Sequence, residues 1–518
     1  MYDAILISPH YHYSQEGTAI PTYDSKNYQD LSMIIPLGIL YIAQHLNDCG
    51  YNVRVVHIPN DLFWLRRFGL TEDNKENLVE KILAKYPARV CGIQVHWYLY
   101  CGGAIFISKV YKKLFPKSKI FLGGHMATAC WKEFLTVSKD IDGVILGEGE
   151  RPFQKIVEKA LTATDAQLDD VAGLAYRSGI SGFAFNPPSS DSLLQLDEIP
   201  TILPDTPAFK NLFWQKRQFI NISRGLCPEN CAYCVGNNKD LNPRTYQTLK
   251  IDKILEQLHV YQECGFRDIF LGENHFLNIS FMKELIENII SENLTLYFEL
   301  ETHPIIFENR KLLSRMVEAN FLRYTMGCES GSDSVLKRMG RNSNSLQIVD
   351  SVKRVAESEG IVLTSWISNL PGETDPEFKE TQGTIKNVVR AGGFVYWIEN
   401  LHVLPGTKLY AQPEAYRIEV LKNNLEDWTE WSILSKEYVD FDTAFAQPLK
   451  YLTHLNKNVS PLEMIERFYS NRKLARSLVP EMKHNLRDKF NRLPSNIIET
   501  ELETLEWYES KGWKLWLF

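Results

Sequence analysis

The sequence predicts an α/β protein in three parts: an N-terminal doubly wound Rossmann-like domain, a central partial (β/α)6 barrel and a mainly helical C-terminal domain. Short apolar strand patterns alternate with helical patterns twice along the chain, which indicates two parallel sheets. A hairpin pattern and a Pro/Ser-rich stretch separate the two runs. A chain of 518 residues is also too long for one core. We expect boundaries at 1–170, 171–215 (linker with hairpin), 216–410 and 411–518.

The first run contains strand patterns at 3–9, 52–59, 89–97, 119–124 and 142–150. Ligands of doubly wound sheets bind beyond the carboxyl ends of the strands. Each residue in these strand-end loops taken alone favours an ordinary turn or core role, but their grouping at successive strand ends supports a binding site as much as that role. The candidate binding residues are Pro9, His10, His96, Trp97, Tyr98, Gly123, Gly124, His125, Gly147, Glu148, Gly149 and Glu150.

The second run contains the strand patterns FINISRG, DIFLGEN, TLYFELE, RYTMGCES, IVLTSWISN and FVYWIENLHVL, with helical patterns between them. Six β/α units predict an incomplete barrel, whose chemistry is expected at the carboxyl ends of the strands. The aromatic, helical segment 411–518 is expected to cap the open side of this barrel.

Three of the nine cysteines, Cys227, Cys231 and Cys234, lie within eight residues on the loop after the first barrel strand. The odd total in a cytosolic chain does not suggest a disulfide framework. Structural zinc takes four protein ligands, and no second Cys or His pair follows at knuckle spacing. An iron–sulfur cube held by three thiolates would leave one iron open for another ligand.

The pattern Cys227-x3-Cys231-x2-Cys234, with an aromatic residue before the last cysteine, resembles the signature of the radical S-adenosylmethionine (SAM) superfamily. FLGENHF, GCESGSDSVLKRMGR, NLPGET and LHVLPGTKLY resemble its later strand-end segments. The resemblance implies that the three thiolates ligate a [4Fe–4S] cluster, that SAM binds the open iron, and that SAM is cleaved to a 5′-deoxyadenosyl radical. The SAM-binding residues that it implies are Tyr233, Glu273, Glu329, Ser330, Arg341, Trp366 and Ile367.

The segments PLGILYIAQHL, FLGGHMAT and GVILGEGERPF resemble the cobalamin-binding domain of class B radical SAM enzymes. The D-x-H-x-x-G loop that supplies a cobalt ligand in other cobalamin proteins does not occur, so the lower face of the cobalt is unassigned and His96, Trp97 and Tyr98 are the residues to inspect. The resemblance implies cobalamin as a cofactor and C-methylation of an unactivated carbon in a small molecule or natural product. It also implies an external electron donor of the flavodoxin or ferredoxin type.

Composition and charge narrow the remaining classes. A net charge of −7 without a basic stripe argues against a nucleic-acid partner. No signal peptide or membrane span is evident, so we expect a cytoplasmic protein. A non-methylating cobalamin reaction, such as cyclisation or ring rearrangement, remains open, as does a non-catalytic zinc- or cobalamin-binding regulator. A methylthiotransferase would need three further cluster cysteines, for which the N-terminal third offers Cys49, Cys91, Cys101 and Cys130.

Overall fold

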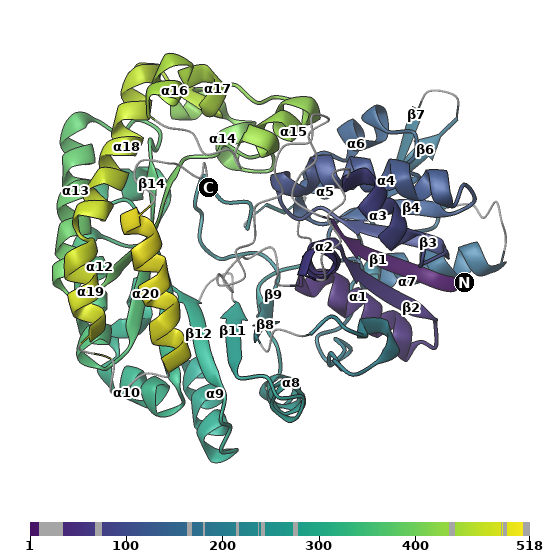
Figure 1. The fold of residues 1–518 in the computed structure, drawn as a ribbon, viewed down its shortest axis with the longest axis horizontal. Coiled ribbons are helices and arrows are strands. Elements are labelled where there is room, and N and C mark those ends of the chain that lie inside the picture. The colour runs from purple at the N-terminus through teal and green to yellow at the C-terminus, as the bar shows by residue number, and fades with distance from the viewer. Residues whose placement is uncertain are drawn as a thin grey trace.

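The computed structural model describes residues 1–9, 35–67, 75–162, 168–179, 182–213, 217–236, 238–239, 244–272, 278–434, 441–487, 489 and 495–510. Two mainly parallel sheets lie side by side, with the C-terminal helices along the barrel (Figure 1). The fold class predicted from the sequence is confirmed.

The first sheet has seven strands in the order β2-β1-β3-β4-β5-β6-β7. Its five parallel strands are β1 (Tyr2–Ser8), β2 (Val53–His57), β3 (Ala88–Gln94), β4 (Lys119–Gly123) and β5 (Gly143–Ile145). The flanking helices are α1 (Leu37–Asp48), α2 (Ile58–Arg67), α3 (Lys75–Leu83), α4 (Cys101–Leu114), α5 (His125–Ala129), α6 (Trp131–Val137) and α7 (Glu150–Thr162). Strand order reverses between β1 and β3, which is where such sheets bind their ligands.

The hairpin that the sequence assigns to a linker belongs to the first sheet. Strand β6 (Leu174–Ser178) pairs antiparallel with β5, and β7 (Gly182–Asn186) pairs antiparallel with β6. The strand pattern 142–150 is correspondingly shorter than expected, because β5 ends at Ile145 and α7 begins at Glu150.

The second sheet has six parallel strands that follow chain order: β8 (Arg217–Asn221), β11 (Asp268–Gly272), β12 (Tyr297–Thr302), β13 (Phe321–Glu329), β14 (Ile361–Ser368) and β15 (Phe394–Asn400). The helices between them are α8 (Ile251–Glu263), α9 (Ile279–Ser291), α10 (Arg310–Glu318), α11 (Asp333–Arg338), α12 (Ser345–Glu357) and α13 (Asp375–Arg390). Buried residues alternate with partly exposed ones along β12, β13 and β14, so one strand face packs in the hydrophobic core and the other lines the barrel interior.

The C-terminal segment covers the free edge and interior of the incomplete barrel. It contains α14 (Lys408–Ala411), β16 (Ile418–Val420), α15 (Leu425–Leu434), α16 (Phe441–Ala446), α17 (Pro448–Tyr451), β17 (His454–Asn456), α18 (Pro461–Ser477), α19 (Val479–Arg487) and α20 (Ser495–Ser510). At the edge strand β15, the Arg472 guanidinium donates to Ile398 O at 3.0 Å, and Val395 N donates to Met482 Sδ at 3.2 Å. These bonds satisfy backbone groups that an open sheet edge would expose.

Glu501 of α20 carries this covering into the barrel interior. Its carboxylate lies 2.8 Å from Nη2 of Arg323 on β13, and Arg323 also contacts Glu299 of β12 at 3.1 Å. Both partners of the Arg323–Glu501 pair are buried. The last described helix is therefore fixed to the inner face of the barrel by charge as well as by apolar packing.

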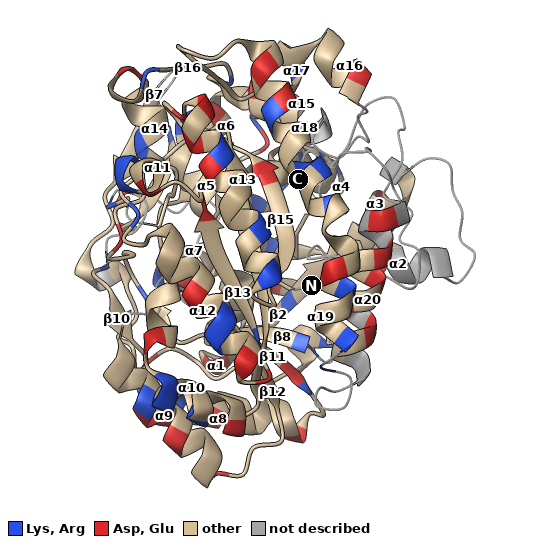
Figure 2. Ribbon diagram, turned by 90° about the vertical axis from the view of Figure 1, so that its left-hand side faces the viewer, with Lys and Arg blue, Asp and Glu red and all other residues tan. Residues whose placement is uncertain are grey.

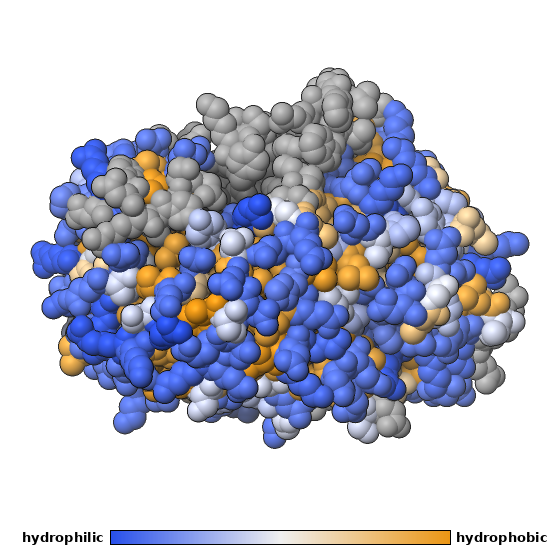
Figure 3. Space-filling model, turned by 90° about the horizontal axis from the view of Figure 1, so that it is seen from below, coloured by the Kyte–Doolittle hydropathy of each residue, from blue (hydrophilic) through white to orange (hydrophobic). Residues whose placement is uncertain are grey.

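The surface carries both signs of charge (Figure 2). Basic and acidic residues are mixed on the helices α8, α9 and α10 (Figure 2), and the face in Figure 3 is mainly hydrophilic, with hydrophobic residues between polar ones. Within the described ranges, no helix is both long and apolar enough to cross a membrane.

Candidate cofactor site

The three clustered cysteines lie on a closed loop at the carboxyl end of the first barrel strand. Two short strands form its neck: β9 (Ser223–Arg224) pairs antiparallel with β10 (Gln247–Thr248). Gly225 has φ +102°, and a Cβ there would lie 2.2 Å from the carbonyl oxygen of Thr245, so only glycine fits. Cys227 N donates to Gly236 O at 2.7 Å and closes the loop.

The loops that follow β13 and β15 hold the cysteine loop in place. Ala232 N donates to Met339 O at 2.9 Å, and Leu409 N donates to Ala232 O at 3.2 Å. On the other side, Asn342 N donates to the buried Glu229 carboxylate at 3.2 Å. The cysteine loop is therefore held by segments after β13 and β15 that are far apart in the sequence.

The donor set of this loop fits an iron–sulfur cluster held by three thiolates. Burial raises the pKa of Cys227 to about 12 and that of Cys234 to about 11, so the free thiols are protonated at neutral pH. Metal coordination deprotonates a thiol outright. Gly236 N already donates to Cys234 Sγ at 3.3 Å, and hydrogen bonds to sulfur are a usual feature of cluster sites. Among the residues described, no group of three or more His, Cys, Asp or Glu side chains is arranged to hold a single metal ion.

Glu329 and Arg341 lie beside the cysteine loop, where the sequence predicts SAM contacts. Glu329 ends β13 with φ +63°, and its carboxylate folds back over Gly327. The Arg341 Nη2 donates to Gly327 O at 2.6 Å. Desolvation raises the pKa of Glu329 to about 7, while the nearby Arg341 lowers it. The Arg341 charge also lowers the pKa of Cys231, which burial raises overall.

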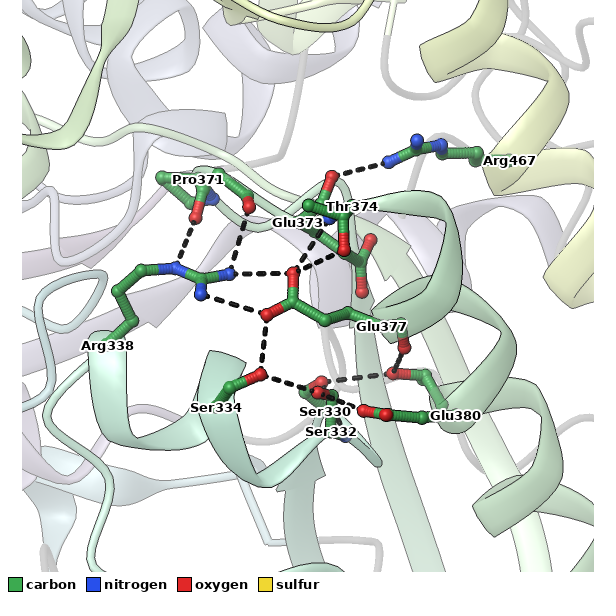
Figure 4. Close-up of polar contacts among 12 residues, drawn as sticks. Ser330, Ser332, Ser334, Arg338, Pro371, Glu373, Thr374, Glu377, Glu380 and Arg467 are labelled. Atoms are coloured by element: carbon green, nitrogen blue, oxygen red, sulfur yellow. Dashed lines mark hydrogen bonds and ion pairs between the residues drawn. The ribbon is translucent and has the colours of Figure 1, made fainter.

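Ser330, a predicted SAM contact, has its hydroxyl engaged in hydrogen bonds within the protein. Ser330 is fully buried, and its hydroxyl lies 3.0 Å from Thr381 Oγ1 and accepts from Ser332 N at 3.1 Å. Neighbouring serines bond to Glu377 and Glu380 of α13 in the same way (Figure 4). These bonds use the Ser330 hydroxyl to fix the loop that carries the preceding glutamate.

Trp366 and Ile367, both predicted SAM contacts, are neighbours on β14 and pack in different hydrophobic clusters. Trp366 is buried in the main core, and its Nε1 donates to Thr364 Oγ1 at 3.0 Å. Ile367 instead packs in the smaller apolar cluster that contains Ala232 and Tyr233 of the cysteine loop. Of the two, Ile367 is the one that lies beside the cysteine loop.

Two inward carboxylates that the sequence analysis missed line the barrel near this site. Glu301 on β12 is exposed to the interior, and Glu399 on β15 shares a register position with Ile367. Desolvation raises the pKa of Glu301 to about 7 and that of Glu399 to about 6; nearby carboxylates add to the first shift. The period-2 spacing of Glu299 and Glu301 in a strand was the available signal for inward polar residues.

The carboxyl edge of the first sheet presents the glycine pair and two histidines. Gly124 has φ +109°, and a Cβ there would lie 2.8 Å from Val95 O, so β3 and the β4–α5 turn meet at this residue. A Cβ at Gly123 would face open space. The side chains of His96 and His125 are exposed in part. Desolvation by the surrounding protein nevertheless lowers the pKa of both imidazoles, that of His96 to about 3. Neutral imidazoles beside an open backbone edge suit a large polar cofactor such as cobalamin.

Other predicted cobalamin contacts are placed differently. Tyr98 is fully buried, with its hydroxyl 3.3 Å from His402 Nδ1 and its ring 5.5 Å from that of Trp428. It therefore joins the first sheet to the barrel and the C-terminal segment. Trp97 is partly exposed beside Tyr98.

The GEGE loop, also predicted to bind cobalamin, lies against the barrel domain. Glu148 and Glu150 form ion pairs with arginines next to the cysteine loop, and a Cβ at Gly149 would clash with Ile42 at 2.8 Å. The two carboxylates therefore contact the barrel domain, whereas Gly149 packs against α1 of its own domain. Gly147, with φ +81°, forms the turn before them.

The remaining predicted residues are Pro9, which is buried at the end of β1, and His10 and Glu273, which lie outside the described residues.

Comparison with known proteins gives independent evidence on the families of the two domains. A family model described as "Radical SAM superfamily" matches residues 221–385, and one described as "B12 binding domain" matches residues 31–157. The chain is 25% identical over 355 residues to the uncharacterized methyltransferase PH0819 of Pyrococcus horikoshii; the match covers 67% of this chain and 72% of that protein.

Solved structures share the fold across both domains. The chain matches the radical SAM methyltransferase TsrM of Kitasatospora setae, solved with tryptophan and a SAM analog, with TM-score 0.63 and 15% identity over 80% of this chain and 78% of that one. It matches the cobalamin-dependent SAM radical enzyme OxsB, solved with aqua-cobalamin and SAM, with TM-score 0.62 and 14% identity over 99% of this chain and 84% of that one.

Proposed function

We propose that this chain, which belongs to the radical SAM enzymes with a B12-binding domain, is a cobalamin-dependent C-methyltransferase that acts on an unactivated carbon of a small molecule. A [4Fe–4S] cluster, SAM and cobalamin are the cofactors of its family. PH0819 and TsrM, which carry methyltransferase names, support methylation. The substrate class follows from tryptophan bound in the TsrM structure and is proposed by analogy.

One structural observation carries the proposal: the carboxyl edges of the two sheets face each other. Glu148, after β5, reaches Arg224 beside the cysteine loop, and Tyr98, after β3, reaches His402 after β15. Contacts on two sides therefore bring the edge bearing Gly124 toward the mouth of the barrel. That arrangement suits a reaction that needs two cofactors and a substrate between them.

When bound, the cluster supplies the electron that cleaves SAM, and cobalamin supplies the methyl group. The chain's own residues would then hold these cofactors and orient them. The three cysteines fix the cluster, Glu329 and Arg341 are placed to bind polar groups of SAM, and the C-terminal helices close the barrel against water.

The test is anaerobic purification with iron, sulfide and hydroxocobalamin, followed by absorption spectra and analysis of SAM products. A methyltransferase binds about one cobalamin per chain and forms S-adenosylhomocysteine together with 5′-deoxyadenosine, because SAM is used both as methyl donor and as radical source. The variant Cys231→Ala should lose 5′-deoxyadenosine formation. Deoxyadenosine without S-adenosylhomocysteine would instead indicate the non-methylating cobalamin chemistry.

A further inference from the structure

The carboxylate of Glu148 is the centre of a buried ion-pair cluster between the two domains, which we call the Glu148 cluster (Glu148, Glu150, Arg224 and Arg244). Arg244 donates to it through Nε at 2.7 Å and Nη2 at 2.8 Å, and Arg224 donates through Nη1 at 3.1 Å. The same Arg224 Nη1 lies 2.8 Å from Glu150. The exposed fractions of these side chains are only 6 to 14%, so solvent screens the charges little.

The two arginines come from the two ends of the cysteine loop. Arg224 is the last residue of β9, and Arg244 lies three residues before β10. Leu226 N donates to Arg244 O at 2.9 Å, so the two chain segments also bond directly to each other. The neck of the loop thus presents both guanidinium groups to one carboxylate from the first sheet.

Charge balance makes the Glu148 cluster stable as a unit and sensitive to the loss of any member. Two guanidinium groups face two carboxylates, and the ring of Tyr41 on α1 lies 5.0 Å from the Arg224 guanidinium. Although desolvation raises the pKa of Glu148, the bonds from Arg244 and Arg224 outweigh it and leave the pKa below its usual range. Removing one partner of such a buried pair is strongly destabilising, because the other charge stays buried.

We propose that Glu148 is a positioning residue that fixes the neck of the cysteine loop to the B12-binding domain. It thereby sets the position of the iron–sulfur cluster relative to that domain. Glu148 follows β5 at the same sheet edge as Gly124, and its two arginines enclose the loop that carries Cys227, Cys231 and Cys234. Bidentate pairing with Arg244 restricts orientation as well as distance. The consequence for a paired cobalamin rests on the proposed function.

The test replaces the carboxylate without changing its size. Glu148→Gln in the protein loaded with its iron–sulfur cluster should raise hydrogen–deuterium exchange of amides in 225–236 and 244–248 by roughly tenfold or more, because local opening no longer breaks the ion pairs of Glu148 with Arg224 and Arg244. Exchange in β13 should stay at the wild-type rate. The matched control is Glu198→Gln, which removes the exposed pair with Arg151 and should change neither segment.

Two outcomes would overturn the proposal: wild-type exchange in 225–236, or an increase there that merely follows an equal increase across the whole protein. If Glu148→Gln fails to fold, Glu148→Asp retains the charge with a shorter reach and should give a smaller increase in the same two segments; no increase would refute the role.

A second readout addresses position directly. Pulsed electron paramagnetic resonance between cob(II)alamin and the reduced iron–sulfur cluster should give a broader distance distribution in Glu148→Gln than in wild type. An unchanged distribution would count against a role of Glu148 in positioning the iron–sulfur cluster. If the wild-type protein binds no cobalamin, the proposed function fails, whereas the exchange experiment still decides the role of Glu148.

Discussion

Replacing Gly327 by alanine should weaken SAM binding without unfolding the protein. Gly327 lies in β13, and a Cβ there would stand 2.5 Å from Glu329 Oε1 and 3.5 Å from Arg341 Nη2. The first distance is far inside van der Waals contact, so the carboxylate must move. Because it is the end of a flexible side chain that moves, and because Gly327 does not have a positive φ that would disfavour alanine, the cost to stability is small.

The magnitude follows from the contact that is lost. A hydrogen bond to a charged group contributes about 1.5–3 kcal/mol, which corresponds to roughly a ten- to hundredfold rise in the dissociation constant of SAM. Isothermal titration of SAM into the cluster-loaded protein would measure it, with thermal melting in parallel. The control is Gly331→Ala, whose Cβ would lie 2.7 Å from the backbone of Thr381 and should lower stability.

Unchanged SAM affinity in Gly327→Ala, or a loss of stability as large as that of Gly331→Ala, would refute this account of the Glu329 carboxylate.

Three further predictions concern the cap, pH and the first sheet. Glu501→Gln leaves the buried Arg323 charge undercompensated and should destabilise α20 by about 3 kcal/mol, measured by local hydrogen exchange, whereas Glu509→Gln removes an exposed pair and should have little effect. Burial raises the pKa of Glu373 from 4.5 to about 7. The contribution of this carboxyl to the free energy of unfolding is therefore complete below pH 4.5 and is lost by about pH 7, a decline of about 3 kcal/mol. Glu373→Gln should flatten this decline when unfolding is measured as a function of pH. Gly124→Ala, strained at φ +109°, should reduce hydroxocobalamin bound per chain, measured by absorbance.

The sequence predicted the two sheets well because parallel strands are buried on both faces. Strands β1 and β3 of the first sheet are mainly apolar, and the predicted ranges 3–9, 89–97 and 361–369 differ from the observed strands by a few residues at their ends. The hairpin was also predicted, but its attachment to β5 was not. Antiparallel addition to a sheet edge depends on which edge is free, and local sequence does not encode that.

The candidate site was predictable only as far as strand ends identify it. Proximity in sequence placed Cys227, Cys231 and Cys234 on one loop, and this needed no tertiary information. Glu148 and Tyr98 were correctly placed at strand ends, yet their partners come from another domain. A carboxylate at a strand end is equally suited to a ligand or to an arginine, and the choice appears only when the two domains are brought together.

The two contacts between the facing sheet edges differ in physical character, and this difference assigns them different tasks. On one side Tyr98, His402 and Trp428 pack through ring faces and edges at 5.5–5.6 Å, contacts that tolerate small displacements. On the other side Glu148 is held by a bidentate arginine bond that restricts both distance and angle. The aromatic contact therefore supplies buried area, while the Glu148 cluster determines the relative position of the two domains. Because Arg224 and Arg244 lie at the two ends of the cysteine loop, a displacement at the Glu148 cluster would also displace the cofactor site.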